Sequence, residues 1–384
     1  MTGFAPTSTT FPFRPLSRLS RPLEAVRQFT PNWFAATMGT GILSIALAQF
    51  PAHSRVLTAI AEGLWLFNIG LFTLFSLVYV SRWIFFFDGA RTIIGHSTMS
   101  MFFGCIPMGL ATIINGFLNF GLARWGHIAI DIAQALWWID VGLSVACGVF
   151  VPLFMFTRQS HAVESMTAIW LLPVVPAEVA AVSAGLLAPH LTDSQQQLVT
   201  LISGYALWAF SVPVAMSVLV ILILRMAVHK LPHSSMAASS WLALGPIGTG
   251  ALGLLVLGGA APTVFESVGL PGYGAPAQGI GLVGGVLMWG YGLWWIAIAS
   301  LITIRYLREG LPFNLGWWGY TFPLGVYAVA TLRLSTVLPI AGLSVAGGAM
   351  VVALALIWLL VAARTVAGVW SGALFASPRL SDNR

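Results

Sequence analysis

The chain has 384 residues, of which 58% are hydrophobic and only 7% are charged. A soluble domain carries about 25% charged residues, so this chain has too few charges to keep a folded surface in water. The composition excludes a soluble enzyme, a nucleic-acid-binding protein and a disordered scaffold, and it predicts a polytopic membrane protein.

The net charge of +6 would indicate a nucleic-acid partner only if the basic residues clustered on one face. They stand instead one or two at a time between apolar blocks, as in the loops of membrane proteins. Cys105 and Cys147 both lie within apolar blocks, so neither a disulfide framework nor a metal site is predicted.

Ten apolar stretches approach or exceed the roughly 20 residues that a helix needs to cross the hydrocarbon core. In chain order they are 32–49, 59–85, 98–119, 131–157, 165–187, 197–225, 238–258, 276–305, 315–333 and 337–365. We expect an all-α protein with a ten-helix transmembrane domain over 31–366 and tails over 1–30 and 367–384.

The distribution of basic residues fixes the expected orientation. With ten spans and a cytoplasmic N-terminus, only Arg55, Arg124 and Arg333 of the 17 Lys and Arg residues fall outside, and the other 14 fall inside. Basic residues concentrate in cytoplasmic loops. The count predicts a multi-pass protein of the plasma or inner membrane with both termini in the cytoplasm.

The odd-numbered segments share a pattern in which an aromatic residue precedes Gly or Pro by six or seven positions. The pairs are Trp33 and Gly39, Phe103 and Gly109, Trp170 and Pro176, Trp241 and Gly248, and Trp318 and Gly325. Prolines also interrupt four of these segments, and a broken backbone in a membrane must be satisfied by protein or by a water-filled cavity.

The repeated pattern predicts five tandem helical hairpins around a quasi-fivefold axis. The shorter, interrupted helices would form an inner ring around a central pore, and the longer helices would face lipid. An equally weighted alternative is that the small residues only permit close helix packing.

Three runs resemble one family of membrane proteins. The run from Pro31 to Gly41 (PNWFAATMGTG) looks like the opening helix of the tellurite-resistance/dicarboxylate transporter family. The run from His96 to Thr112 is similar to the third helix of that family, and the run from Phe313 to Pro323 (FNLGWWGYTFP) resembles its ninth. The family includes fungal malate permeases, fungal sulfite efflux pumps and plant slow anion channels.

The resemblance implies five hairpins, a pore through each protomer and a homotrimer. It also implies that a phenylalanine of the ninth helix closes the pore, and by position in the run this residue is Phe322. Phe322 lies about 12 Å into its helix at 1.5 Å per residue, near the middle of the bilayer. The implied substrates are small anions, either C4-dicarboxylates such as malate or oxyanions such as sulfite and tellurite.

No Lys or Arg lies in the middle of any predicted span, so backbone, hydroxyls and helix ends must attract the anion. Hydroxyls on Thr37, Thr40, Thr112, Thr249 and Thr321 are the candidates for this. The full set of expected pore-lining residues is Thr37, Gly39, Gly41, Gly104, Pro107, Gly109, Pro173, Pro176, Gly245, Gly248, Thr321 and Pro323. Basic residues at the cytoplasmic mouth, such as Arg305 and Arg308, either concentrate anions there or only set the topology.

Two acids lie within predicted spans, about 14 Å from the external end at 1.5 Å per residue. Glu178 follows Pro176 by two residues and is a candidate for coupling proton and substrate movement. The alternative is a neutral carboxyl bonded to backbone that the prolines leave free. Asp140, beside Trp137 and Trp138, is expected to be structural.

The sequence contains no phosphate-binding loop, nucleophile–base pair or redox cysteine motif, and its histidines lack metal-ligand spacing. No cofactor, metal or catalytic residue is therefore expected. The leading prediction is a transporter or channel for small anions, embedded in the lipid bilayer. The alternatives are a membrane-embedded enzyme or a receptor without transport activity.

Overall fold

The computed structural model describes residues 15–52 and 54–375. The described part is entirely helical, without a strand, as the sequence predicts. The outermost parts of the expected tails, 1–14 and 376–384, lie outside the described residues, and with them Arg14, Arg379 and Arg384 of the basic residues counted above.

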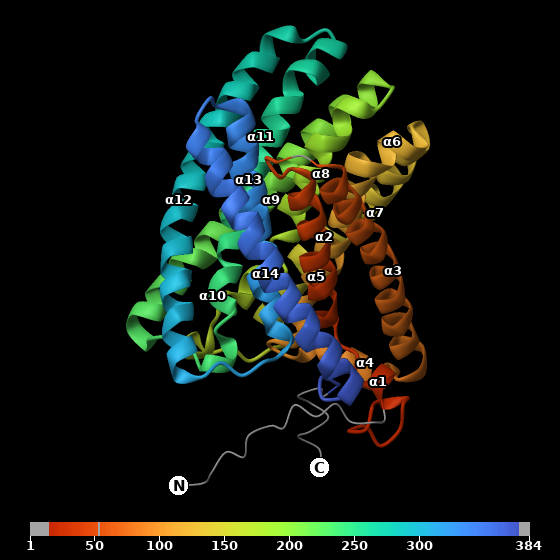
Figure 1. Ribbon diagram of the computed structural model, residues 1–384, viewed down its shortest axis with the longest axis vertical. Helices are drawn as coiled ribbons and strands as arrows, with labels where there is room; N and C mark the ends of the chain where they lie inside the picture. Colours follow the sequence, from red (N-terminus) through yellow and green to blue (C-terminus); the bar gives the residue numbers. More distant parts are fainter. Residues whose placement is uncertain (1–14, 53, 376–384) are drawn as a thin grey trace.

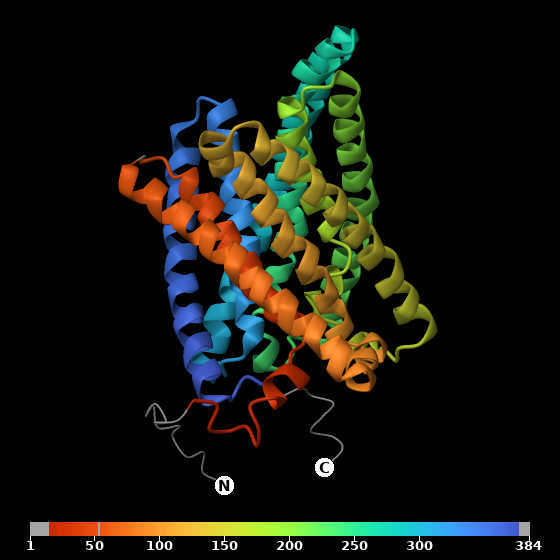
Figure 2. The same ribbon diagram turned by 90° about the vertical axis from the view of Figure 1, so that its right-hand side faces the viewer.

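Five helices of 31 to 36 residues form the outer part of the bundle (Figure 1). They are α3 (Arg55–Phe85), α7 (His127–Thr157), α9 (Ser194–His229), α12 (Gly274–Glu309) and α14 (Ala341–Ser371). All five correspond to even-numbered segments of the sequence prediction. Figure 2 shows α3 crossing the bundle obliquely.

Five shorter helices lie inside these and follow the odd-numbered segments. They are α2 (Ala35–Ala48), α5 (Cys105–Gly116), α8 (Pro176–Leu187), α11 (Leu244–Ser267) and α13 (Thr321–Val337). A short helical turn comes shortly before each one, namely η1 (Pro31–Phe34), η3 (Met99–Gly104), η6 (Ala168–Leu171), α10 (Ser239–Leu242) and η10 (Leu315–Tyr320). The chain thus enters each inner helix through a short turn, and four of the five turns are 3-10 helices.

The prolines stand at these entrances. Pro107, Pro246 and Pro323 are each the third residue of an inner helix, and Pro176 is the first residue of α8. The first turn of a helix needs no internal N–H donor there, so proline is tolerated. These four prolines therefore mark where inner helices begin, whereas Pro262 lies in the interior of α11.

The remaining short elements connect the helices. They are α1 (Glu24–Arg27), α4 (Phe87–Arg91), η2 (Thr92–Gly95), the π-turn η4 (Phe117–Gly121), α6 (Leu122–Trp125), η5 (Val163–Ser165), η7 (Ala188–His190), η8 (Ser234–Met236) and η9 (Pro271–Tyr273).

Within the described residues, seven continuous helical stretches are long and apolar enough to span a membrane. In the five outer helices, 17% to 33% of the most apolar window is buried, against 83% in Met99–Trp125 and Ser234–Ser267. The predicted segments 32–49, 165–187 and 315–333 are helical but shorter, so the ten-span topology stays a prediction.

The inner helices contact one another in a closed ring. Helix α2 contacts α5, α5 contacts α8, α8 contacts α11, and α11 contacts α13. Helix α13 in turn contacts α2. Each inner helix also packs on the outer helix that follows it in the chain, as α11 does on α12. The resulting order is an inner ring with one outer helix behind each member.

One tryptophan on every outer helix ties it to the inner helix of the next pair. The indole N–H groups of Trp65, Trp137 and Trp208 donate to the backbone carbonyls of Ile113, Ala180 and Gly250 at 2.9 to 3.1 Å. Those of Trp289 and Trp358 donate to the hydroxyls of Thr331 and Thr40 at 2.9 and 3.1 Å. The last of these bonds joins α14 to α2, so the series closes on itself.

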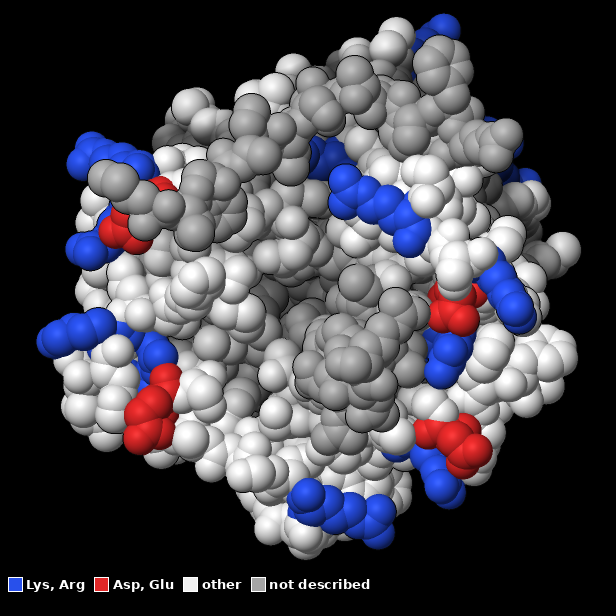
Figure 3. Space-filling view, turned by 90° about the horizontal axis from the view of Figure 1, so that it is seen from below, with Lys and Arg blue, Asp and Glu red and all other residues white. Residues whose placement is uncertain are grey.

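Both ends of the described chain lie on one face, called here the terminal face. The N–H of Leu16 donates to the carbonyl of Trp370 at 2.7 Å. Arg55, Arg124 and Arg333 lie toward the other, opposite face, and the remaining described Lys and Arg residues lie toward the terminal face. Figure 3 looks onto the terminal face, where basic side chains surround a central hollow.

Candidate functional site

Two cavities lie along the axis of the inner ring. The terminal cavity, about 400 Å³, is bordered by residues near the chain ends such as Thr30 and Leu374. The opposite cavity, about 510 Å³, is bordered by Gln49, directly after the end of α2, and by Ser344, near the start of α14. Each cavity is large enough for a small hydrated ion.

All five helices of the inner ring border the opposite cavity, with Ile42, Thr112, Val179, Thr249 and Val326 among the lining residues. The terminal cavity is bordered by α2, α5 and α13, through residues such as Met38, Cys105 and Phe322. The segments that lead into α8 and α11 complete it, with Leu172 and Leu242. The two cavities are therefore successive levels within one ring.

Within the described part of the chain, Phe322 is the one residue that borders both cavities. It is the second residue of α13, one position before Pro323, and only 3% of its side chain is exposed. A buried aromatic ring between two cavities is a barrier to any polar solute that moves along the axis.

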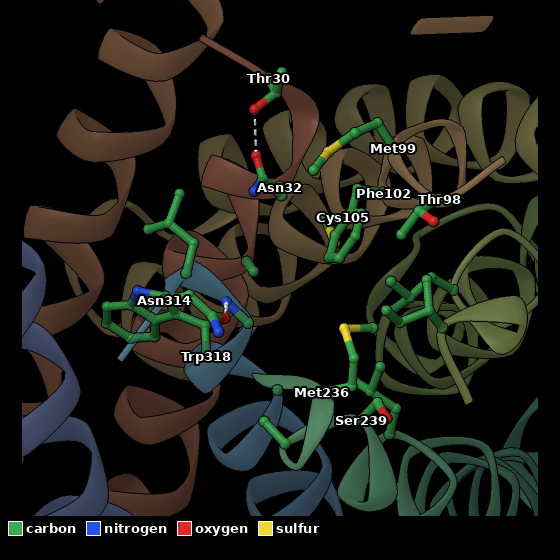
Figure 4. Close-up of a pocket in the computed structure, with 18 of the residues that line it drawn as sticks. Thr30, Asn32, Thr98, Met99, Phe102, Cys105, Met236, Ser239, Asn314 and Trp318 are labelled. Carbon is green, nitrogen blue, oxygen red and sulfur yellow. Dashed lines mark hydrogen bonds between the residues drawn. The ribbon is translucent and has the colours of Figure 1, made fainter. Parts of the chain in front are cut away.

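The lining of the terminal cavity contains several sulfur-bearing side chains, and its described residues are uncharged. Met99 and Met236 lie near Cys105 and Phe102 in Figure 4. Polar groups stand among them, but Asn314 is already engaged, since its Oδ1 accepts from the N–H of Gly316 at 2.8 Å. No charged side chain of residues 15–52 and 54–375 borders this cavity.

The lining of the opposite cavity is more polar. It includes Arg333, Asn115, Asn119, Thr112 and Thr249. The Nε of Arg333, the Oδ1 of Asn115 and the hydroxyl of Thr249 are buried and have no hydrogen-bond partner. Buried polar atoms in proteins are normally paired, so these three retain unused hydrogen-bonding capacity beside the cavity.

Most of the threonine hydroxyls expected in the pathway are used inside the protein. Thr37 and Thr321 each donate to a carbonyl three residues back at 2.7 Å. Thr40 accepts from Trp358, and Thr112 accepts from Asn68 at 3.1 Å while donating to Gly109. Thr249 alone of the five retains an unpaired hydroxyl.

Of the full set of twelve expected pore-lining residues, Pro323 alone borders either cavity, although two of the candidate hydroxyl residues, Thr112 and Thr249, border the opposite one. Thr37 and Thr321 lie in the inner ring without bordering a cavity, and so do Pro107, Pro173 and Pro176. The glycines lie where helices approach each other: a methyl group on Gly39, Gly41, Gly104, Gly109 or Gly248 would meet atoms of a neighbouring helix or turn. A methyl on Gly245 would lie 3.9 Å from the ring of Pro323. These positions match the packing alternative.

Glu178 and Asp140 are fully buried, and both oxygens of each carboxyl have no hydrogen-bond partner among the described residues. Neither borders a cavity, although Val179 and Val182 of the same helix as Glu178 do. Glu178 therefore lies close to the opposite cavity but does not border it.

The basic residues of the terminal face surround the terminal cavity without bordering it. Arg305 pairs with Glu309 at 3.1 Å, and both side chains are exposed. Arg308 is not among the cavity residues either. Within the described residues, no group of three or more His, Cys, Asp or Glu side chains is arranged to hold a metal ion.

Arg333 and Asn115 are site residues that the sequence prediction missed. Arg333 served there only to set the topology, because a sequence shows that it ends a span but not that it borders a cavity. Asn115 is a polar residue within an otherwise apolar stretch, which was the one available signal.

Comparisons with known proteins agree on one family. A family model described as "SLAC1: Voltage-dependent anion channel" matches residues 28–366. The sulfite efflux pump of Trichophyton rubrum is 38% identical over 349 residues, covering 89% of this chain and 91% of that protein. The sulfite efflux pump of Saccharomyces cerevisiae is 25% identical and covers 81% and 80% of the two chains. The malic acid transport protein of Schizosaccharomyces pombe is 24% identical and covers 88% and 77%.

Proposed function

Because the chain belongs to the SLAC1 family of voltage-dependent anion channels, we propose that it carries small anions across a cell membrane through the axis of its inner ring. The relatives described above are a channel family and transporters, not enzymes. The enzyme and receptor alternatives have no comparable support.

One observation carries the proposal. Five inner helices form a closed ring, and the two cavities along its axis share only Phe322. The ring of Phe322 is the gate, and an anion passes when this side chain turns away. The two cavities then join into one path from the terminal face to the opposite face.

The proposal includes ten spans arranged as five hairpins with quasi-fivefold symmetry. Its support is the ring of inner contacts, the partner helix behind each member and the five tryptophan bonds. The concentration of Lys and Arg on the terminal face supports a cytoplasmic location for both chain ends. The domain limits 31–366 and a homotrimeric assembly belong to the same proposal, and native mass spectrometry in detergent would test the trimer.

Sulfite is the first substrate to test and malate the second. The sulfite efflux pump of Trichophyton rubrum shares 38% of its residues with the chain over most of both proteins, against 24% for the malic acid transport protein. Tellurite belongs to the same class of oxyanions. Glu178 is proposed to couple proton movement to transport, because a buried carboxyl without partners is costly to ionise and responds to entering water.

The test is a flux panel in proteoliposomes with purified protein. Sulfite, malate, nitrate and chloride are compared with and without a pH gradient, against protein-free vesicles. Flux of at least one anion above the protein-free level is expected. Silence with every anion in either direction would contradict the proposal.

A further inference from the structure

The opposite cavity contains a charge that the gate does not use. Among the residues that the structure describes, Arg333 is the only charged one that borders either cavity. It is half-buried, and none of the ion pairs within the described residues includes it. Its Nε is buried and has no hydrogen-bond partner.

Two buried arginines on the terminal face show what a structural arginine looks like in this protein. Arg82 donates to the carbonyls of Phe29 and Gly89, at 2.5 and 3.1 Å. Arg225 donates to the carbonyl of Lys230 at 2.6 Å and to the carbonyl of Glu164, in η5, at 3.1 Å. Each guanidinium group therefore hydrogen-bonds two backbone carbonyls from different parts of the chain. Among the described residues, Arg333 donates to no backbone carbonyl. Stabilisation of a backbone segment therefore does not explain its position.

Other unpaired polar atoms lie in the same cavity. The Oδ1 of Asn115 and the hydroxyl of Thr249 have no partner, and the two side chains are 6% and 1% exposed. A methyl on Gly259 would lie 3.1 Å from Nη2 of Arg333, which places the guanidinium beside Gly259 of α11. Thr249 precedes Gly259 by about 15 Å along that helix. The cavity is therefore charged near its mouth and neutral but polar near Phe322.

We propose that this cavity contains an oxyanion-binding site in which Arg333 is the first contact and Asn115 and Thr249 hydrogen-bond the anion deeper in. A guanidinium group offers parallel N–H donors that match two oxygens of a carboxylate or sulfite ion, and a spherical halide cannot use this geometry. The site rests on the proposed function, because it assigns a substrate class to the proposed path.

The test measures binding separately from transport. Sodium sulfite, potassium malate and sodium chloride are titrated calorimetrically into purified protein in detergent. Arg333→Gln is expected to weaken sulfite binding about tenfold or more, as for loss of a charge-assisted hydrogen bond. Arg333→Lys keeps the charge but not the fork, so it should lose more affinity for sulfite than for chloride. Arg55→Gln is the control, since Arg55 is an exposed arginine near the same face that borders neither cavity.

A second variant protects the test against misfolding of Arg333→Gln. Gly259→Ala leaves the charge in place but puts a methyl group 3.1 Å from Nη2 of Arg333. It should also weaken sulfite binding, whereas Gly63→Ala, at a position with no neighbour within 4 Å, should not.

The outcomes separate the site from the transport function. Sulfite and malate binding that is unchanged in Arg333→Gln and Gly259→Ala would overturn the site, even if the wild type transports sulfite. The absence of sulfite and malate binding to the wild type would also overturn it. Binding that depends on Arg333, together with no flux of any anion, would support the site and contradict the proposed function.

Discussion

The indole N–H of Trp358 donates a 3.1 Å hydrogen bond to the hydroxyl of Thr40, 318 positions earlier in the chain. Each of the other four outer helices has one tryptophan that bonds to the next inner helix. The bond of Trp358 joins the last outer helix to the first inner one. The ring is therefore closed by a specific contact as well as by packing.

Trp358→Phe should destabilise the protein without closing or opening the path. Loss of one hydrogen bond of this part-buried kind costs about 0.5–1.5 kcal/mol, which should lower the apparent Tm in detergent by a few degrees. Trp294→Phe is the control, because Trp294 is 47% exposed and donates no hydrogen bond among those described. Equal Tm values for the two variants would contradict a stabilising role for the ring of tryptophan bonds.

Phe322→Ala should make the protein leak. If the ring is the barrier, its removal should lower the barrier by at least about 1.4 kcal/mol, a tenfold rise in anion flux. Val329→Ala, on the same helix but bordering only the opposite cavity, should leave flux near the wild-type value. Folding is checked by a single symmetric peak in size-exclusion chromatography. A well-folded Phe322→Ala variant with wild-type flux would reject the gate.

Thr249→Val separates a transport effect from a stability effect. The hydroxyl of Thr249 is buried and unpaired, so its removal should not lower stability. Flux should fall by about 2- to 12-fold, as for loss of one neutral hydrogen bond to the anion. Thr112→Val should instead lower stability, because the hydroxyl of Thr112 bonds to Asn68 and Gly109. Unchanged flux in a stable Thr249→Val variant would remove Thr249 from the path.

Glu178→Gln tests proton coupling. If Glu178 gains and loses a proton during transport, the variant should keep downhill anion flux and lose its acceleration by a pH gradient. Asp140→Asn is the matched control, since Asp140 is equally buried and unpaired but lies on an outer helix. The measurement is sulfite flux with and without an imposed gradient. A gradient effect that survives in Glu178→Gln excludes coupling through this residue.

Gly41→Ala tests the packing role of the inner glycines. A methyl group there would meet the side chain of Thr112 and would lie 2.7 Å from Nδ2 of Asn68. Overpacking of this kind costs about 1–3 kcal/mol. Gly70→Ala, with no neighbour within 4 Å, should be neutral or stabilising, because alanine favours the helix by up to about 1 kcal/mol. The measurement is the Tm of both variants in thermal unfolding, and Gly41→Ala should have the lower value. Similar Tm values would contradict the packing role of Gly41.

The sequence located the long helices but not what their side chains touch. Apolar length predicted ten helical segments, because burial in lipid requires an apolar surface whatever the packing, and seven helical stretches within the described residues are long and apolar enough to span a membrane. The sequence predicts that the glycines line the pore. In the structure, glycine is required instead where two helices pack too closely for a side chain, as at Gly41 against Thr112. No pattern along one helix shows which of its faces meets a neighbour.

The position of Phe322 in the ninth-helix run predicts that it closes the pore, and the structure shows that it borders both cavities, whereas no sequence pattern predicts the tryptophan series. The five donors stand on five helices, and three of their acceptors are backbone carbonyls, which leave no mark on the sequence. Arg333 was overlooked for a related reason. An arginine near the end of a span sets orientation in any membrane protein, and only the three-dimensional structure shows that this one borders a cavity.

The bond from Leu16 to Trp370 places the start of the described chain beside the end of its last long helix. A ring whose first and last members are joined in this way does not depend on where synthesis begins. A circular permutant, with its old ends linked and new ends opened in the Arg158–Thr167 connection between α7 and η6, should assemble the same bundle. The cyclic order of the helical pairs, and not the position of the amino terminus, then defines this architecture.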